Sequence, residues 1–163
     1  MDTKTFSKFY QDKPHFKLTN PNPEWGNTKS LKWNRPDCVI RAVALSTGLS
    51  WLEAFDFLSA KARRDYTIPN DGTRLRQWLA EAGASWTAIT VKPGKKRLTA
   101  EDFAKSHPEG RYILRLAHHE AACVDGVILD AWNCSAKCVY GYIHVTNIKK
   151  ESLSCEASQY RNL

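Results

Sequence analysis

Arg35-Pro36-Asp37-Cys38-Val39-Ile40-Arg41-Ala42-Val43-Ala44 is the stretch that decides the fold, because it begins a buried helix with a cysteine in its first turn. Pro36 disfavours helical geometry for the residue before it, and Asp37 is a favourable N-cap whose carboxylate can accept unpaired amide hydrogens. The helix dipole and these free amides lower the pKa of a cysteine thiol at this position. Cys38 is therefore a candidate nucleophile, and the alternative is a small buried thiol.

Composition limits the class of protein. The 163 residues, 42% of them hydrophobic, suffice for one domain with a core. No apolar run approaches a membrane span and the first residues lack the apolar region of a secretion signal, so we expect a cytoplasmic protein without a membrane partner. The five cysteines are odd in number and form no CxxC pair, which favours free thiols. The net charge of +7 favours solubility or an acidic partner, and without a basic–aromatic motif we expect no nucleic-acid partner.

Helical patterns come first along the chain and strand patterns follow. Helices are expected over 38–47, over 51–64 behind a Ser50–Glu53 capping box, and near 75–82. A strand near 86–91 and a short helix after Thr99 precede four strands over 111–117, 119–124, 127–132 and 139–145. Their short connections imply antiparallel pairing. This order predicts an α+β domain over residues 35–150, followed by a tail over 151–163.

Residues 1–34 are expected to form an N-terminal arm. Pro21 and Pro23 forbid regular helix there, whereas Trp25 and Trp33 are large aromatic residues that favour contact with the domain. The arm is either a structural strap, which we favour, or one wall of a substrate cleft.

A hairpin near residue 125 gathers the candidate general base. Asp125-Gly126 predicts a two-residue turn, and the register that follows puts Asp130 diagonally opposite His119 on one face of the sheet. The pair can hydrogen-bond, which gives the base and the orienting acid of a catalytic triad. His118 points to the opposite face, toward Asn133, and forms a rival pair. The turn alone does not choose between the two histidines.

Several segments resemble a papain-like cysteine peptidase group found in phage and bacterial genomes. The resemblance covers most of residues 20–145, and it is carried by Asn20-Pro21-Asn22-Pro23, Asp37-Cys38-Val39-Ile40-Arg41-Ala42 and Thr47-Gly48-x-Ser50-Trp51. In that group a histidine strand leads through an Asp-Gly turn to an Asp-x-Trp segment, which His119, Asp125-Gly126 and Asp130-Ala131-Trp132 match. It implies a papain-like fold, in which N-terminal helices carry the cysteine and a C-terminal antiparallel sheet carries the histidine and the aspartate.

The resemblance selects His119 over His118, and it implies Cys38 as nucleophile, His119 as general base and Asp130 as orienter. The sequence departs from the group at Ala117, where a glycine commonly precedes the histidine, and at Ala131, which replaces a threonine. No glutamine shortly before Cys38 completes an oxyanion hole, and Asn34 is the nearest candidate.

Two other functions compete with catalysis at Cys38. Cys134 and Cys138, with Cys123 and the histidines nearby, are ligands that zinc accepts, but no second compact pair exists, so we expect no metal and no cofactor.

The function expected is that of a cysteine hydrolase (thiol protease) that cleaves amide or isopeptide-type bonds of a protein or peptide substrate through an acyl-enzyme. Transamidase or acyltransferase activity stays open. The rival is a non-catalytic binding protein on the same scaffold, such as a phage-type factor that sequesters or inhibits a host protein.

Overall fold

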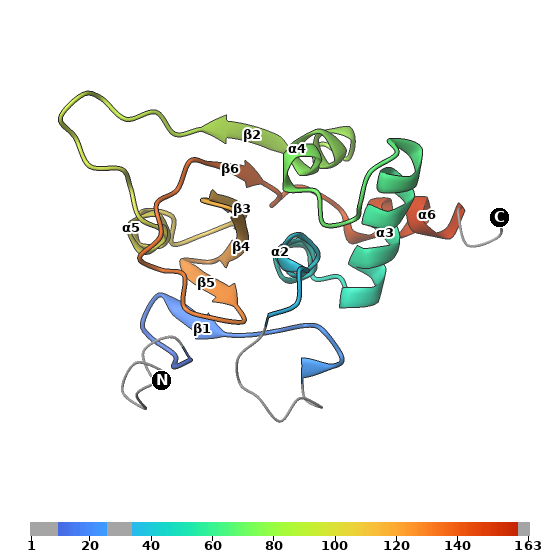
Figure 1. The fold of residues 1–163 in the computed structure, drawn as a ribbon, viewed down its shortest axis with the longest axis horizontal. Coiled ribbons are helices and arrows are strands. Elements are labelled where there is room, and N and C mark those ends of the chain that lie inside the picture. Colours follow the sequence, from blue (N-terminus) through green and yellow to red (C-terminus); the bar gives the residue numbers. More distant parts are fainter. Residues whose placement is uncertain (1–9, 26–33, 160–163) are drawn as a thin grey trace.

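A computed structural model describes residues 10–25 and 34–159 (Figure 1). In this part of the chain, five helices accompany a six-stranded mixed sheet, which confirms the predicted α+β class. The elements in chain order are β1 (Phe16–Leu18), α2 (Cys38–Thr47), α3 (Trp51–Arg64), α4 (Gly72–Glu81), β2 (Ser85–Ala88), α5 (Ala100–Ser106), β3 (Arg111–Leu116), β4 (His119–Val124), β5 (Val127–Asp130), β6 (Gly141–His144) and α6 (Lys150–Gln159).

The sheet has the strand order β1-β5-β4-β3-β6-β2. Strands β3, β4 and β5 form the predicted antiparallel meander, and β6 and β2 extend it with antiparallel pairs. Strand β1 pairs in parallel with β5, with Leu18 opposite Asp130. The arm therefore contributes an edge strand. A strand of three residues near prolines is too short to show an alternating pattern of hydrophobic residues in the sequence. Trp33 lies outside the described residues.

The helices begin and end where local sequence signals place them. Gly48 ends α2 with a φ of +75°, a left-handed conformation that costs glycine little. Ser50 and Glu53 form the predicted capping box of α3. The expected tail over 151–163 instead starts within α6, whose Leu153 is buried and which packs on α3. No single helix among residues 10–25 and 34–159 is long and apolar enough to cross a membrane. Helices α2 and α3 would together meet the length and composition of a span, but the chain bends by 118° between them.

Two hydrophobic clusters lie on the two sides of the sheet. One joins α2, α3 and α4 to Ile113 and Ile143, and the other joins Phe103 of α5 to Leu114 and Ile128. Figure 1 shows α2 between the sheet and α3, with α5 on the opposite side of the sheet. Helix α2 packs against β4, and Cys38 in the first turn of α2 interacts with His119 and the backbone of Glu120 at the start of β4.

Candidate active site

Cys38 is the first residue of α2 and is half-buried. The predicted capping by Asp37 is wrong, because the side chain of Asp37 makes no capping hydrogen bond. Asn70, in the loop before α4, takes that role: its Oδ1 accepts the backbone N–H of Val39 at 2.9 Å. The start of the helix is thus capped from a segment 31 residues away, and the carboxylate of Asp37 is left for other partners.

The carboxylate of Asp37 joins three segments of the chain. Its Oδ2 accepts hydrogen bonds from Asn22 Nδ2 at 2.9 Å and from Trp51 Nε1 at 3.0 Å, and its Oδ1 pairs with Arg41. Asn22 and Trp51 belong to the segments that carry the family resemblance in the sequence. The two side chains converge on the carboxylate of Asp37, the residue that precedes the thiol.

His119 and Asp130 meet across the predicted hairpin. Val124 pairs with Val127, and Asp125 and Gly126 have the positive φ values of 47° and 74° that a type I′ turn needs. In this register His119 Nε2 hydrogen-bonds Asp130 Oδ2, and the ring of Trp132 lies 5.1 Å from the imidazole centroid. The carboxylate fixes the tautomer of the imidazole and leaves Nδ1 for the sulfur of Cys38.

His118 does not form the rival pair. It is exposed and lies in the turn between β3 and β4 with a φ of +54°, so it does not face Asn133 from the opposite side of a strand. Leu116 pairs with His119, which makes Ala117 and His118 a second two-residue turn. Neither residue is a glycine, which explains why the sequence did not reveal this turn.

Cys38 and His119 shift each other's pKa within the site. Burial opposes a thiolate at Cys38, but the hydrogen bonds from His119 and the Glu120 backbone, with the positive charges of His119 and Arg41, lower its pKa. Burial likewise opposes the imidazolium, but the hydrogen bonds with Asp130 and Cys38 raise the pKa of His119 to about 9. The two groups therefore stabilise each other's charged forms, a thiolate beside an imidazolium.

Arg41 connects the thiol helix to the hairpin. Its guanidinium pairs with Asp37 and, at 3.0 Å, with Oδ1 of Asp130, and the side chains of Arg41 and Asp130 are only 3% and 2% exposed. Burial favours a neutral Asp130, but the hydrogen bond with His119 and the charges of His119 and Arg41 lower its pKa. Asp130 is thus held ionised beside the imidazole of His119.

The candidate metal ligands that lie together in the structure differ from the cysteines and histidines considered from the sequence. Cys134 groups with His119 and Asp130, with ligand atoms within 4.8 Å of one another, and this set could hold a metal ion. Burial raises the pKa of the Cys134 thiol well above its usual range, and the thiol lies 3.5 Å from Oδ2 of Asp130 as a donor. Asp130 already pairs with two cations, so a third cation would find poor ligands here. Cys138 is exposed and lies outside the group, and Cys38, Cys123, Cys134 and Cys138 are free thiols.

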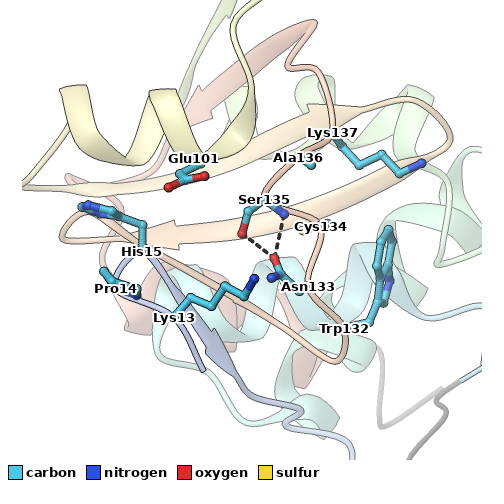
Figure 2. A pocket seen from close by; sticks show the side chains of 10 residues that line it. All are labelled: Lys13, Pro14, His15, Glu101, Trp132, Asn133, Cys134, Ser135, Ala136 and Lys137. Atoms are coloured by element: carbon cyan, nitrogen blue, oxygen red, sulfur yellow. Dashed lines mark hydrogen bonds between the residues drawn. The ribbon is translucent and has the colours of Figure 1, made fainter. Parts of the chain in front are cut away.

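Two pockets begin next to these residues. One, of about 410 Å³, lies between residues 13–15, Glu101 and the loop over 132–137, and includes Trp132, the ring neighbour of His119. Figure 2 shows Asn133 accepting two hydrogen bonds from Ser135 within this loop. The other pocket, of about 180 Å³, is lined by Glu120 and by Gly72, two residues beyond Asn70. Its lining continues through Thr73, Arg76, Trp86, Arg115, Tyr140 and Ile143.

Asn70 and Arg41 are the site residues that sequence reasoning missed. Asn70 Nδ2 lies 3.9 Å from Sγ of Cys38, whereas Asn34, the expected oxyanion-hole candidate, is exposed. Pro69-Asn70-Asp71-Gly72 has the composition of an ordinary turn, which conceals a polar side chain directed at another element. No family model, no curated protein and no solved structure matches the chain.

Proposed function

We propose that the protein is a papain-like cysteine hydrolase in which Cys38 is the nucleophile, His119 the general base and acid, and Asp130 the orienter. One observation carries this proposal: a thiol at a helix N-terminus lies beside an imidazole that a buried carboxylate holds through a hydrogen bond. Each group has the pKa direction that thiol catalysis needs. The bond cleaved is an amide or isopeptide-type bond of a protein or peptide.

The reaction follows from these positions. The Cys38 thiolate attacks the substrate carbonyl carbon, and the carbonyl π electrons move to the oxygen. Collapse of this intermediate restores the carbonyl and expels the amine, which takes the proton from His119. A water molecule, deprotonated by His119, then attacks the thioester, and collapse of this second intermediate releases the carboxylic acid and the Cys38 thiolate. Arg41 and Asp130 keep the imidazole in one orientation through both steps.

The charges around the two pockets favour an acidic polypeptide substrate. Arg76 and Arg115 line the smaller pocket with Glu120, which pairs with Arg115, so Arg76 is the cation whose charge Glu120 does not offset. Lys13 and Lys137 line the larger pocket with Glu101. We therefore propose acidic residues on both sides of the scissile bond. The free cysteines fit a reducing compartment, which supports a cytoplasmic location.

Covalent acylation tests the proposal without a known substrate. Wild type is treated with p-nitrophenyl acetate, release of nitrophenol is followed, and the acylated residue is found by peptide mapping. We expect an acyl adduct on Cys38 that water then releases, and a much slower reaction in His119→Ala. Cys138→Ala is the matched control, because Cys138 is exposed and outside the site. Acylation distributed over the exposed thiols would contradict a catalytic Cys38.

A proteolysis assay separates an enzyme from a binding protein. Wild type and Cys38→Ala are incubated with a bacterial lysate, and newly formed protein N-termini are quantified by mass spectrometry. A hydrolase generates N-termini that Cys38→Ala does not. A binding protein on this scaffold leaves the lysate unchanged, and its biological effect survives Cys38→Ala.

A further inference from the structure

The side chain of Asn70 uses both ends of its amide at the start of α2. Oδ1 accepts the N–H of Val39 at 2.9 Å, and Nδ2 points at Sγ of Cys38 from 3.9 Å. The orientation of the amide follows from chemistry, because only the oxygen can accept a backbone N–H. The donor end is therefore held toward the thiol by the backbone of the same helix.

A second donor lies at the same place. The first amides of a helix have no acceptor within the helix, and Cys38 is the first residue of α2. The Cys38 N–H and Asn70 Nδ2 thus both belong to the immediate surroundings of the sulfur. A carbonyl attacked by this sulfur develops negative charge on its oxygen next to the new carbon–sulfur bond, within reach of donors that surround the thiol.

We propose that Asn70 is a catalytic residue, whose Nδ2–H and the backbone N–H of Cys38 form the oxyanion hole. This inference rests on the proposed function. As the carbon–sulfur bond forms, the carbonyl π pair becomes the oxyanion, and Nδ2–H shifts its hydrogen bond from the sulfur to that oxygen. When the carbonyl re-forms and the leaving amine departs with the proton of His119, the hydrogen bond returns to the sulfur. No other reactant is needed.

The alternative role for Asn70 is that of a helix cap only. A cap stabilises α2 through Oδ1, whereas an oxyanion hole acts through Nδ2, so the two roles depend on different atoms. Asn70→Ser and Asn70→Asp keep an oxygen that can cap a helix but lack the amide donor. A single oxyanion-hole donor contributes roughly 10²–10³ in rate.

Two reagents for the same thiol isolate the donor. Iodoacetamide alkylates Cys38 by displacement and forms no oxyanion, whereas p-nitrophenyl acetate acylates it through one. The ratio of the acylation rate to the alkylation rate therefore cancels changes in thiolate content. It is measured for wild type, Asn70→Ser, Asn70→Asp and the control Asn34→Ser, each checked for folding by circular dichroism. Asn34 is a matched control because it is exposed, whereas Asn70 contacts the thiol of Cys38.

We expect the ratio to fall about 10²–10³-fold in Asn70→Ser and Asn70→Asp and to stay unchanged in Asn34→Ser. An unchanged ratio in a folded Asn70→Asp, or an equal loss of both reactions, would make Asn70 a cap or a thiolate support and overturn the inference. These results leave acylation of wild-type Cys38 intact. If wild-type Cys38 itself is not acylated, the proposed function fails, and the oxyanion hole fails with it.

Discussion

Arg41→Met should destabilise the domain far more than an ordinary loss of an ion pair. The side chains of Arg41 and Asp130 are 3% and 2% exposed, and methionine fills similar space without the charge. Asp37 and Asp130 would remain buried without the guanidinium, and loss of one partner of a buried pair costs about 3–5 kcal/mol. The total free energy of unfolding of a domain of this size is about 5–15 kcal/mol. At roughly 2–4 °C for each kcal/mol, the melting temperature should fall by about 6–20 °C.

Thermal and urea unfolding followed by circular dichroism measure this loss. Lys105→Met is the matched control, because Lys105 pairs with Glu101 on the surface, with side chains 52% and 48% exposed. We expect no measurable change in that control. A loss below about 1 kcal/mol in Arg41→Met would refute the reasoning that this guanidinium is needed to hold two buried carboxylates.

The pH dependence checks the cause of the loss. In wild type the pKa of Asp130 is lowered, so its contribution to stability is complete above the unfolded value and is lost only as pH falls through the folded value. Without Arg41 the folded pKa of Asp130 is higher, and the buried carboxyl can be protonated at moderate acidity. The stability gap between wild type and Arg41→Met should therefore narrow between pH 7 and about pH 4. A gap that widens would exclude Asp130 as its origin.

Further expectations concern reactivity. Iodoacetamide at about pH 6 should alkylate Cys38 much faster than Cys123, whose pKa burial raises to about 12, and equal labelling in peptide mapping would contradict a thiolate at Cys38. The rate of acylation by an amide substrate, whose leaving amine takes its proton from His119, should decline above about pH 9, and a stopped-flow profile that keeps rising would exclude His119 as the proton donor. Asp130→Asn should keep a fraction of the wild-type hydrolase activity. Cys38→Ala should remove that activity, and adding His119→Ala to Cys38→Ala should lower the rate no further. Lys137→Glu should raise KM for fluorogenic peptides with acidic flanks and leave kcat unchanged. Equal KM values for wild type and Lys137→Glu would exclude a preference for acidic substrates at this pocket.

Local signals predicted most of the fold. The capping box at Ser50, the glycine at residue 48 and the Asp125-Gly126 turn act over a few residues, and the structure contains each of them. The turn also set the register that joins His119 to Asp130. These features were predictable because their physical cause lies within the segment that shows them.

Contacts between distant segments were not predictable in the same way. Strand β1 has three residues and no readable period, and its place is determined by β5, more than a hundred residues later. Asn70 caps a helix 31 residues before it, and the likewise missed Arg41 bonds Asp130 from 89 residues away. A polar residue in a turn or on a helix gives no sign of such a partner. Only the folded arrangement identifies it.

Arg41 shows why the site depends on these distant contacts. The thiol of Cys38 belongs to a helix and the imidazole of His119 to a hairpin, and hydrophobic packing between them tolerates small shifts more readily than directional, charge-assisted hydrogen bonds do. Arg41 bonds Asp37, the neighbour of Cys38, and Asp130, the partner of His119, so one buried guanidinium links the position of the thiol to that of the imidazole. A change at Arg41 should therefore lower stability, alkylation and acylation together. A change at Asn70 should lower acylation selectively, and this contrast distinguishes a residue that holds the site from one that acts in it.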